Sequence, residues 1–212
     1  MTATRAMIQG LYAITDASLL PPAQLLRAVE QALRGGAALV QYRDKSPHTE
    51  RRLKQASQLK QLCDRYSVPL LINDDLALAR ACDAAGVHLG QGDSKLRQAR
   101  AELGPEAIIG ITCHDSLSLA LEAQQAGASY VAFGRFFPSL TKPDAPSAPL
   151  DLLVRARSQL QLPLVAIGGI TVDNAGQVIS RGADAIAVVH HLFSSSDIEQ
   201  RARDLNSTFD SF

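Results

Sequence analysis

Short apolar runs alternate with longer amphipathic stretches along the whole chain. The apolar runs are rich in Val, Ile and Leu, which is typical of buried strands. The stretches between them place apolar residues at i, i+3 and i+4, as in residues 25–33 (LLRAVEQAL), and this spacing predicts helices with one buried face. We therefore expect eight strands, at residues 11–15, 38–42, 69–73, 86–90, 107–112, 130–134, 163–170 and 185–190.

Strands that alternate with helices predict a parallel sheet built from βαβ units. Eight such units in 212 residues favour an α/β fold closed into a single (β/α)8 barrel, the TIM barrel. A doubly wound open sheet is the alternative, and the even count of eight favours the barrel. Four helix-to-strand junctions carry small pairs: Gly36-Ala37, Ala85-Gly86, Gly127-Ala128 and Gly182-Ala183. No linker or low-complexity tract interrupts the pattern, so we expect one catalytic domain over residues 1–212.

Composition narrows the classes of partner. The formal net charge is zero, so no overall field favours nucleic acid or an anionic membrane. No apolar segment approaches the roughly 20 residues that span a bilayer, and the N-terminus lacks the apolar core of a signal peptide. The three cysteines, Cys63, Cys82 and Cys113, form no CxxC pair and fit a reducing compartment. We expect a cytoplasmic enzyme that binds small molecules.

Polar residues gather where the expected strands end, which is where barrel enzymes carry their active sites. After the second strand, Gln41, Arg43 and Lys45 occupy every second position and therefore share one face of an extended chain. No acid in the sequence obviously neutralises these donors, which favours an anionic ligand. Either cation alone is more often a solvated or salt-bridged surface residue.

Acidic residues follow the third and fourth strands. Asn73-Asp74-Asp75 ends the third strand, and Asp93 follows the fourth. Neighbouring parallel strands lie about 4.8 Å apart, so Asp74 and Asp93 could share one cation. Two carboxylates with phosphate oxygens and water suit Mg²⁺. A turn or helix cap is the alternative for this run, and we expect that role for Asp75.

A second cluster lies in the short loops after the seventh and eighth strands, at Gly168-Gly169-Ile170 and at Val188-Val189-His190. Barrels frequently bind a phosphate with the backbone N–H groups of these two loops and a nearby helix N-terminus. Gly169 would let the backbone approach the phosphate closely. A plain tight turn is the alternative, and Asn174 is expected to belong to the helix start.

The longest connection after any strand runs from residue 134 to residue 149 and holds four of the ten prolines. Its length predicts a lid that orders over a ligand, with Lys142 contributing charge. A mobile surface excursion is the alternative.

The histidines say less about the function of the chain than the motifs above do. His114 could help to orient a ligand, whereas we expect His88 to be structural and His48 to be solvated. Cys113 is expected to act as a small buried apolar residue. No Ser/His/Asp or Cys/His spacing supports nucleophilic catalysis.

Seven segments resemble, in order and spacing, the motifs of the thiamine-phosphate synthase family: QYRDK, INDD, GVHLGQGD, GITCHD, FGRFFPSLTKP, VAIGGIT and GADAIAVV. The resemblance covers residues 10–193 and implies a (β/α)8 barrel that joins two phosphorylated heterocycles with Mg²⁺ as cofactor. These are 4-amino-2-methyl-5-(diphosphooxymethyl)pyrimidine and 4-methyl-5-(2-phosphoethyl)thiazole or its carboxylated form. The implied products are thiamine phosphate and diphosphate.

The resemblance also implies roles for individual residues. The pyrimidine diphosphate would be bound by Gln41, Tyr42, Arg43, Asp44, Lys45, Asn73, Thr112 and Lys142. The thiazole phosphate would be bound by Ser139, Leu140, Thr141, Gly169, Val189 and His190. Arg43, Lys45 and Lys142 would be the catalytic cations, and Asp74 and Asp93 would bind Mg²⁺.

The chain departs from the family pattern at three positions. Thr112 stands where many relatives have Ser, and PSLTK replaces PTxTK; each keeps a hydroxyl, at Thr112 and Ser139. His190 replaces the usual Ser after the eighth strand. That change is harmless if the backbone N–H binds phosphate, and it weakens binding if the side chain does.

The implied reaction is a dissociative substitution, since an electron-rich aminopyrimidine stabilises the benzylic-type cation that forms when diphosphate leaves. The protein then stabilises the leaving group and positions the thiazole nitrogen, and no general base is required. Three alternatives are a thiazole tautomerase of the same fold, a Schiff-base aldolase and a phosphate-ligand sensor. The combined cation and acid residues oppose the first and third, and the loop position of Lys142 opposes the second. A homo-oligomer is compatible with the sequence.

Overall fold

The eight strands lie where the apolar runs predict them, each beginning within one residue of its expected start. The structure is a computed structural model that describes residues 8–91, 93–139 and 146–211, with the backbone alone described at Asp93 and Ser94. Its strands are β1 (Gly10–Ile14), β2 (Leu39–Tyr42), β3 (Leu70–Asn73), β4 (Gly86–Leu89), β5 (Ile108–His114), β6 (Tyr130–Phe133), β7 (Leu164–Ile167) and β8 (Ala185–Val188).

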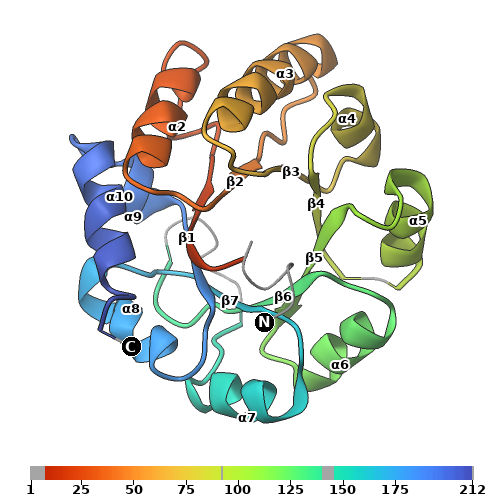
Figure 1. Cartoon of the computed structure of the whole chain (residues 1–212), viewed down its shortest axis with the longest axis vertical. Coiled ribbons are helices and arrows are strands. Elements are labelled where there is room, and N and C mark those ends of the chain that lie inside the picture. Colours follow the sequence, from red (N-terminus) through yellow and green to blue (C-terminus); the bar gives the residue numbers. More distant parts are fainter. Residues whose placement is uncertain (1–7, 92, 140–145, 212) are drawn as a thin grey trace.

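These strands form one closed parallel barrel in sequence order, so the predicted (β/α)8 fold is confirmed (Figure 1). Parallel pairing of β1 with β8 closes the ring. The open-sheet alternative is therefore excluded.

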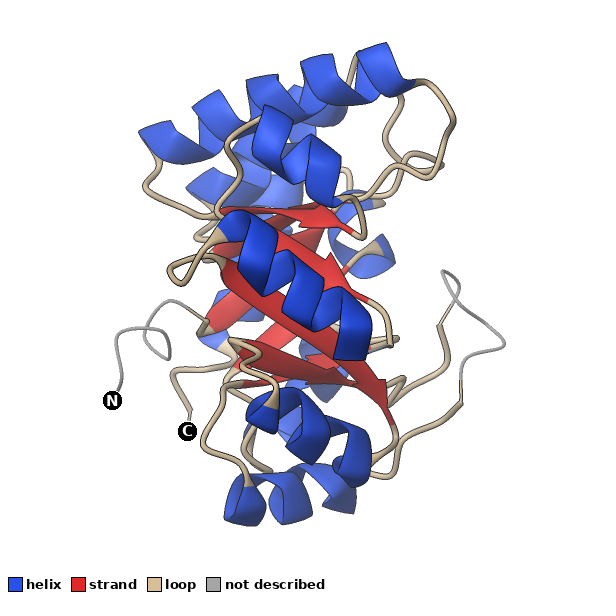
Figure 2. Ribbon diagram, turned by 90° about the vertical axis from the view of Figure 1, so that its right-hand side faces the viewer, coloured by secondary structure: helices blue, strands red, loops and turns tan. Residues whose placement is uncertain are grey.

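Helices surround the barrel, and in side view the strands lie between them (Figure 2). The helices are α2 (Leu25–Arg34), α3 (Thr49–Arg65), α4 (Leu76–Ala81), α5 (Asp93–Leu103), α6 (Leu117–Gln125), α7 (Asp151–Gln159), α8 (Val172–Ile179), α9 (His190–Phe193) and α10 (Ile198–Ser207). Within the described residues, none is long and apolar enough to cross a membrane.

The apolar core has two layers. The larger one lies between strands and helices and includes Val40 and Ile109 from the strands and Leu59 from α3. The smaller one fills the barrel interior and includes Tyr12 and Tyr130 among aliphatic side chains. Successive strand residues point to opposite layers, which is why the strands read as continuous apolar runs.

The four small-residue junctions are present, and they serve two purposes. Gly36, Gly127 and Gly182 have φ of +91°, +88° and +102°, the left-handed conformation expected after a helix. Gly86 differs, because a Cβ there would lie 1.8 Å from the Ile108 carbonyl oxygen. That glycine permits close approach of β4 and β5, while Asp83, with φ of +54°, makes the left-handed turn.

Candidate active site

A cavity of about 320 Å³ opens at the carboxyl ends of the strands, and all eight strands or the loops after them contribute to it. Ten of the residues selected from the sequence line it: Gln41, Arg43, Lys45, Asn73, Asp74, Thr112, Ser139, Gly169, Val189 and His190. The fold thus brings together residues that are spread over most of the chain.

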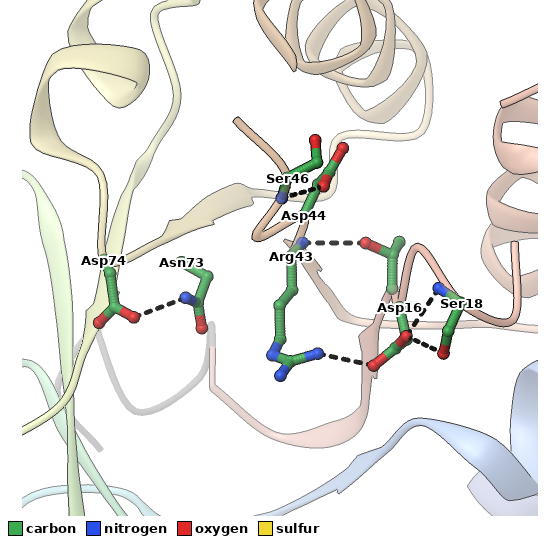
Figure 3. A network of polar contacts seen from close by, with 8 residues as sticks. Asp16, Ser18, Arg43, Asp44, Ser46, Asn73 and Asp74 are labelled. Atoms are coloured by element: carbon green, nitrogen blue, oxygen red, sulfur yellow. Dashed lines mark hydrogen bonds and ion pairs between the residues drawn. The ribbon is translucent and has the colours of Figure 1, made fainter. Parts of the chain in front are cut away.

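Arg43 does have a neutralising acid, so the expectation of unopposed donors after β2 is wrong. Its Nη1 donates to Asp16 Oδ2 over 2.6 Å (Figure 3). The backbone N–H of Ser18 donates to Asp16 Oδ1 over 2.9 Å, and the backbone N–H of Arg43 donates to Thr15 Oγ1 over 2.9 Å. Thr15 and Asp16 follow β1, so the first loop aims the guanidinium. Among the described residues its side chain bonds only Asp16, which leaves several of its five N–H groups for an anion.

Asp74 is held at the cavity edge by its backbone conformation and by two hydrogen bonds. Its φ is +62°, and Asn73 Nδ2 donates to its Oδ2 over 2.8 Å (Figure 3). The backbone N–H of Gly90, after β4, donates to Oδ1 over 3.2 Å. The next residue, Asp75, accepts from the Leu78 N–H over 2.9 Å and caps α4, which confirms its predicted role.

The carboxylate oxygens beside β3 and β4 are the kind of ligand that a hard cation prefers. Each carboxylate oxygen of Asp74 accepts one hydrogen bond, and a carboxylate offers about four lone-pair sites. Asp93 is the first residue of α5, which follows β4, and its side chain lies outside the described part. No group of three or more His, Cys, Asp or Glu suited to a metal occurs among the described residues. Mg²⁺ bound by one or two carboxylates, water and substrate oxygens needs no such group.

Thr112 and His114 lie on β5, where the register with β6 shifts between them. His114 has φ of +51° and lines the cavity. His88, on β4, also lines it, and its Nε2 lies 2.9 Å from Thr112 Oγ1. Cys113 is fully buried between them, and burial raises the pKa of its thiol to about 12, so it behaves as the apolar residue we expected.

The loops after β6 and β7 pack closely at the other side of the cavity. Phe136 N–H donates to the Ile167 carbonyl over 3.2 Å, and a Cβ on Gly169 would lie 2.2 Å from the Pro138 carbonyl oxygen. Asn174 Nδ2 donates to the Gly169 carbonyl over 3.0 Å and so joins this turn to the start of α8, as expected of a helix-start residue. Packing therefore requires Gly169 whether or not a phosphate binds.

Val189 and His190 stand at the start of α9, beside this turn. The following residue, His191, also lines the cavity, and its Nε2 accepts from Arg201 Nη1 over 2.6 Å. Burial, and then the charge of Arg201, lower the pKa of His191. A neutral imidazole thus lies between α9 and α10 at the cavity edge.

Comparison with known proteins now identifies the family. The family model described as "Thiamine monophosphate synthase" matches residues 11–192. A thiamine-phosphate synthase from Nitrosococcus oceani is 55% identical over 205 residues, covering 97% of this chain and 94% of that protein. The chain belongs to the thiamine monophosphate synthase family. It is an enzyme of the transferase class whose product, as in this family, is thiamine phosphate.

Solved structures agree with this family assignment. A thiamine phosphate pyrophosphorylase from Pyrococcus furiosus superposes with a TM-score of 0.88 at 35% identity, covering 98% of each chain. A 3-hexulose-6-phosphate synthase superposes with a TM-score of 0.70 at 16% identity over 94% of this chain and 99% of the other, which shows the fold alone.

Not every residue that the family resemblance selects lies on the cavity. The side chains of Tyr42 and Asp44 point to a smaller cavity of about 140 Å³ behind β2, where Tyr42 OH donates to Gln55 Oε1 over 2.8 Å. The alternation along the chain turns them away from Gln41 and Lys45, while Arg43 lines both cavities. Leu140, Thr141 and Lys142 lie outside the described residues, which include only the two ends of the predicted lid, residues 134–139 and 146–149.

Sequence reasoning missed three cavity residues or their partners. Asp16 directly follows the first expected strand and is the partner of Arg43. No residue after that strand was selected from the sequence. Arg135 lies within the FGRFFPSLTKP motif and His191 lies two residues after GADAIAVV, and both line the cavity.

Proposed function

We propose that this family member condenses 4-amino-2-methyl-5-(diphosphooxymethyl)pyrimidine with 4-methyl-5-(2-phosphoethyl)thiazole, or its carboxylated form. Diphosphate leaves and thiamine phosphate forms. The observation that carries this reaction is a single cavity with cationic and acidic side chains after β2 and β3 and glycine-rich backbone after β7. Two separate anionic groups can be bound there at the same time.

The first of these anions is the diphosphate. Arg43, Lys45 and Asn73 line the cavity and can donate to its oxygens, and Gln41 lies beside them in the pyrimidine-diphosphate site. Asp16 holds one edge of the Arg43 guanidinium, so the remaining N–H groups are oriented before the ligand arrives. Lys142 completes the cationic set in the proposal, on the strength of the family motif alone.

Asp74 and Asp93 are proposed to hold Mg²⁺ at this end of the cavity. When bound, the ion would offset the charge that develops on the departing diphosphate. The hydrogen bonds from Asn73 and Gly90 fix Asp74 at the cavity edge with lone pairs left for the ion.

The second anion is the thiazole phosphate. Ser139 and the turn at Gly169 line the cavity opposite β2, and the start of α8 lies next to that turn. Backbone N–H groups and a helix N-terminus favour a phosphate in such a turn. Leu140 and Thr141 belong to the proposed set through the family motif, while Val189 and His190 would close the phosphate site from α9.

The substitution is proposed to be dissociative. Diphosphate leaves first, and the thiazole nitrogen then attacks the exocyclic carbon of the pyrimidine cation. The protein holds the two rings in reach and stabilises the leaving group. No proton needs to be removed from the attacking nitrogen, so no general base is assigned.

The remaining features of the proposal concern the whole protein. We infer that residues 1–212 form one catalytic domain that works in the cytoplasm, and a homo-oligomer is compatible with this proposal. The three cysteines are free and buried, which suits a reducing compartment. Tyr42 and Asp44 are retained as members of the diphosphate region, acting from behind Arg43.

The test is to mix purified protein with both substrates, in Mg²⁺ or in EDTA, and to follow diphosphate and thiamine phosphate. Mg²⁺-dependent release of both products supports the proposal. Tight binding of the thiazole phosphate without any product would favour a tautomerase or a sensor. Trapping of a lysine by borohydride would favour an aldolase.

A further inference from the structure

A line of five polar side chains crosses the barrel interior beneath the cavity. Gln41 Nε2 donates to Tyr12 OH over 2.6 Å, and Tyr12 OH lies 2.9 Å from Tyr130 OH. Tyr130 OH lies 2.8 Å from His88 Nδ1, and His88 Nε2 lies 2.9 Å from Thr112 Oγ1. These residues come from β2, β1, β6, β4 and β5, so the line connects opposite sides of the barrel.

The two ends of this line face the cavity, whereas its middle is sealed. Gln41, His88 and Thr112 line the cavity, but Tyr12 and Tyr130 are only 1% and 0% exposed. Neither phenol lines the cavity, whereas Gln41 does although it is itself only 2% exposed. The two phenols are therefore connected to the cavity through their hydrogen bonds to Gln41 and His88.

The interior is built to accept these rings. Tyr12 and Tyr130 pack edge to face with centroids 6.0 Å apart, and the His88 ring stacks on Tyr130 at 5.7 Å. A Cβ on Gly110 would lie 2.0 Å from Tyr130 Cζ, so glycine at this position makes room for the ring. The phenol positions are thus fixed by packing.

Hydrogen-bond chemistry gives the line a direction. The Gln41 Nε2 can only donate, so Tyr12 OH accepts from it and places its single hydrogen toward Tyr130. Tyr130 then places its own hydrogen toward His88 Nδ1. A histidine that accepts at Nδ1 carries its proton at Nε2, and it donates to Thr112 Oγ1. Burial raises the pKa of both phenols, so both keep the hydrogens that this order requires.

We propose that Tyr12 and Tyr130 are positioning residues that fix the polarity of the two cavity groups at the ends of the line, Gln41 and Thr112. The amide of Gln41 presents its carbonyl oxygen to the cavity as an acceptor, and the hydroxyl of Thr112 presents its hydrogen as a donor. A heterocycle with an N–H group toward Gln41 and a ring-nitrogen lone pair toward Thr112 fits this arrangement. An aminopyrimidine offers both groups, and this assignment rests on the function proposed above.

The line predicts a specificity that shape alone would not give. A ring of the same size with a carbonyl in place of its amino group would place an acceptor against the Gln41 carbonyl oxygen. Reversal of the amide would require every hydrogen along the line to turn with it. The phenols thereby make discrimination at Gln41 depend on His88, on the other side of the barrel.

The first test uses ¹⁵N NMR of histidine-labelled protein without substrate, with a His88→Gln variant to identify the signals. We expect His88 in the wild type to carry its proton at Nε2. Tyr130→Phe removes the donor to Nδ1 and should shift the His88 nitrogen signals toward a mixture of tautomers. Tyr12→Phe leaves Tyr130 beside His88 and should shift them less. Tyr66→Phe, which removes a hydroxyl bonded to Glu30 away from the line, is the matched control.

The second test measures steady-state kinetics of the same variants. Loss of a buried hydrogen-bond partner should lower kcat/KM for the pyrimidine diphosphate about tenfold or more in Tyr12→Phe and Tyr130→Phe. KM for the thiazole phosphate should stay within about twofold, because that site lies across the cavity. A general loss of structure would affect both substrates and lower the melting temperature.

The two tests separate this inference from the proposed function. A proton at Nδ1 of wild-type His88, or unchanged His88 signals in Tyr130→Phe, would overturn the inference whatever the enzyme makes. The inference would also be overturned if Tyr12→Phe and Tyr130→Phe impaired the use of the thiazole phosphate as much as that of the pyrimidine diphosphate. Absence of thiamine phosphate from the wild-type reaction would overturn the proposed function, and the NMR result would still decide on the line.

Discussion

At the residue scale, the ion pair between Asp16 and Arg43 determines how much positive charge the cavity offers to a ligand beside β2. Removing Asp16 would have two opposed effects on a bound diphosphate. The positive potential at Arg43 would increase, which favours ground-state binding. The guanidinium would also lose the charge-assisted hydrogen bond that aims it, which matters more for the departing group in the transition state.

We therefore predict that Asp16→Ala lowers kcat about tenfold while KM for the pyrimidine diphosphate stays constant or falls. Steady-state kinetics at saturating thiazole phosphate will measure both. Asp64→Ala is the matched control, since Asp64 pairs with Lys60 over 2.6 Å on the outer surface of α3. A raised KM with unchanged kcat would mean that Asp16 does not orient Arg43.

Adjacent acids after β3 provide a second prediction at this scale. Asp74→Ala should lower turnover by about 10²–10³ and weaken its dependence on Mg²⁺, which is the effect of losing a strong electrostatic stabiliser. Asp75→Ala should instead lower the free energy of unfolding by about 1 kcal/mol, because Asp75 caps α4. Metal titrations of activity and urea unfolding of both variants will distinguish the roles. Near-normal turnover and metal response in Asp74→Ala would refute its assignment.

At the scale of elements, the sequence predicts the strands and their order well. Both faces of each strand from β1 to β8 are largely buried, so each strand is a near-continuous run of apolar residues in the sequence. Which polar residues follow each strand is equally visible, so ten cavity residues were found. The pairing of side chains is not visible. Tyr12 and Tyr130 are 118 positions apart, and Asp16 and Arg43 are 27 apart, so only the closed barrel brings them together.

The contact between α9 and α10 leads to a pH prediction. Burial and Arg201 lower the pKa of His191, although Asp173 acts in the opposite direction. The folded state therefore binds this proton less readily than the unfolded state, so its contribution to stability is present at neutral pH. It is lost as pH falls below about 6.5, the ordinary histidine value.

We expect His191→Asn to reduce the fall in unfolding free energy between pH 7.5 and pH 5.5, by less than about 1 kcal/mol because the site is partly exposed. Urea unfolding at several pH values will measure this slope. His48→Asn, at an exposed position, is the control and should leave the slope as in the wild type. An identical slope in His191→Asn would show that another group carries the acid sensitivity.

At the scale of the whole molecule, the candidate active site and the contacts of the C-terminal helix lie at opposite ends of the barrel. The cavity lies at the carboxyl ends of the strands, whereas α10 joins the first βα unit at their amino ends. There Asn206 accepts from the Leu11 N–H over 3.1 Å and donates to the Gly35 carbonyl over 3.0 Å. One side chain near the C-terminus thereby secures β1 and the turn after α2.

Asn206→Ala should consequently lower the free energy of unfolding by about 1–3 kcal/mol, because it leaves the backbone N–H of Leu11 without its partner. The kcat for thiamine phosphate formation should remain within about twofold of the wild type at temperatures where both proteins stay folded, since no cavity residue contacts Asn206 through these bonds. Gln200→Ala, at an exposed position of the same helix, is the control for helix propensity and should change neither quantity. Urea unfolding and steady-state kinetics on the three proteins will measure the separation. A large loss of kcat without loss of stability would mean that closure of the ring at its amino end is transmitted to the cavity, and that the two ends of this barrel do not act independently.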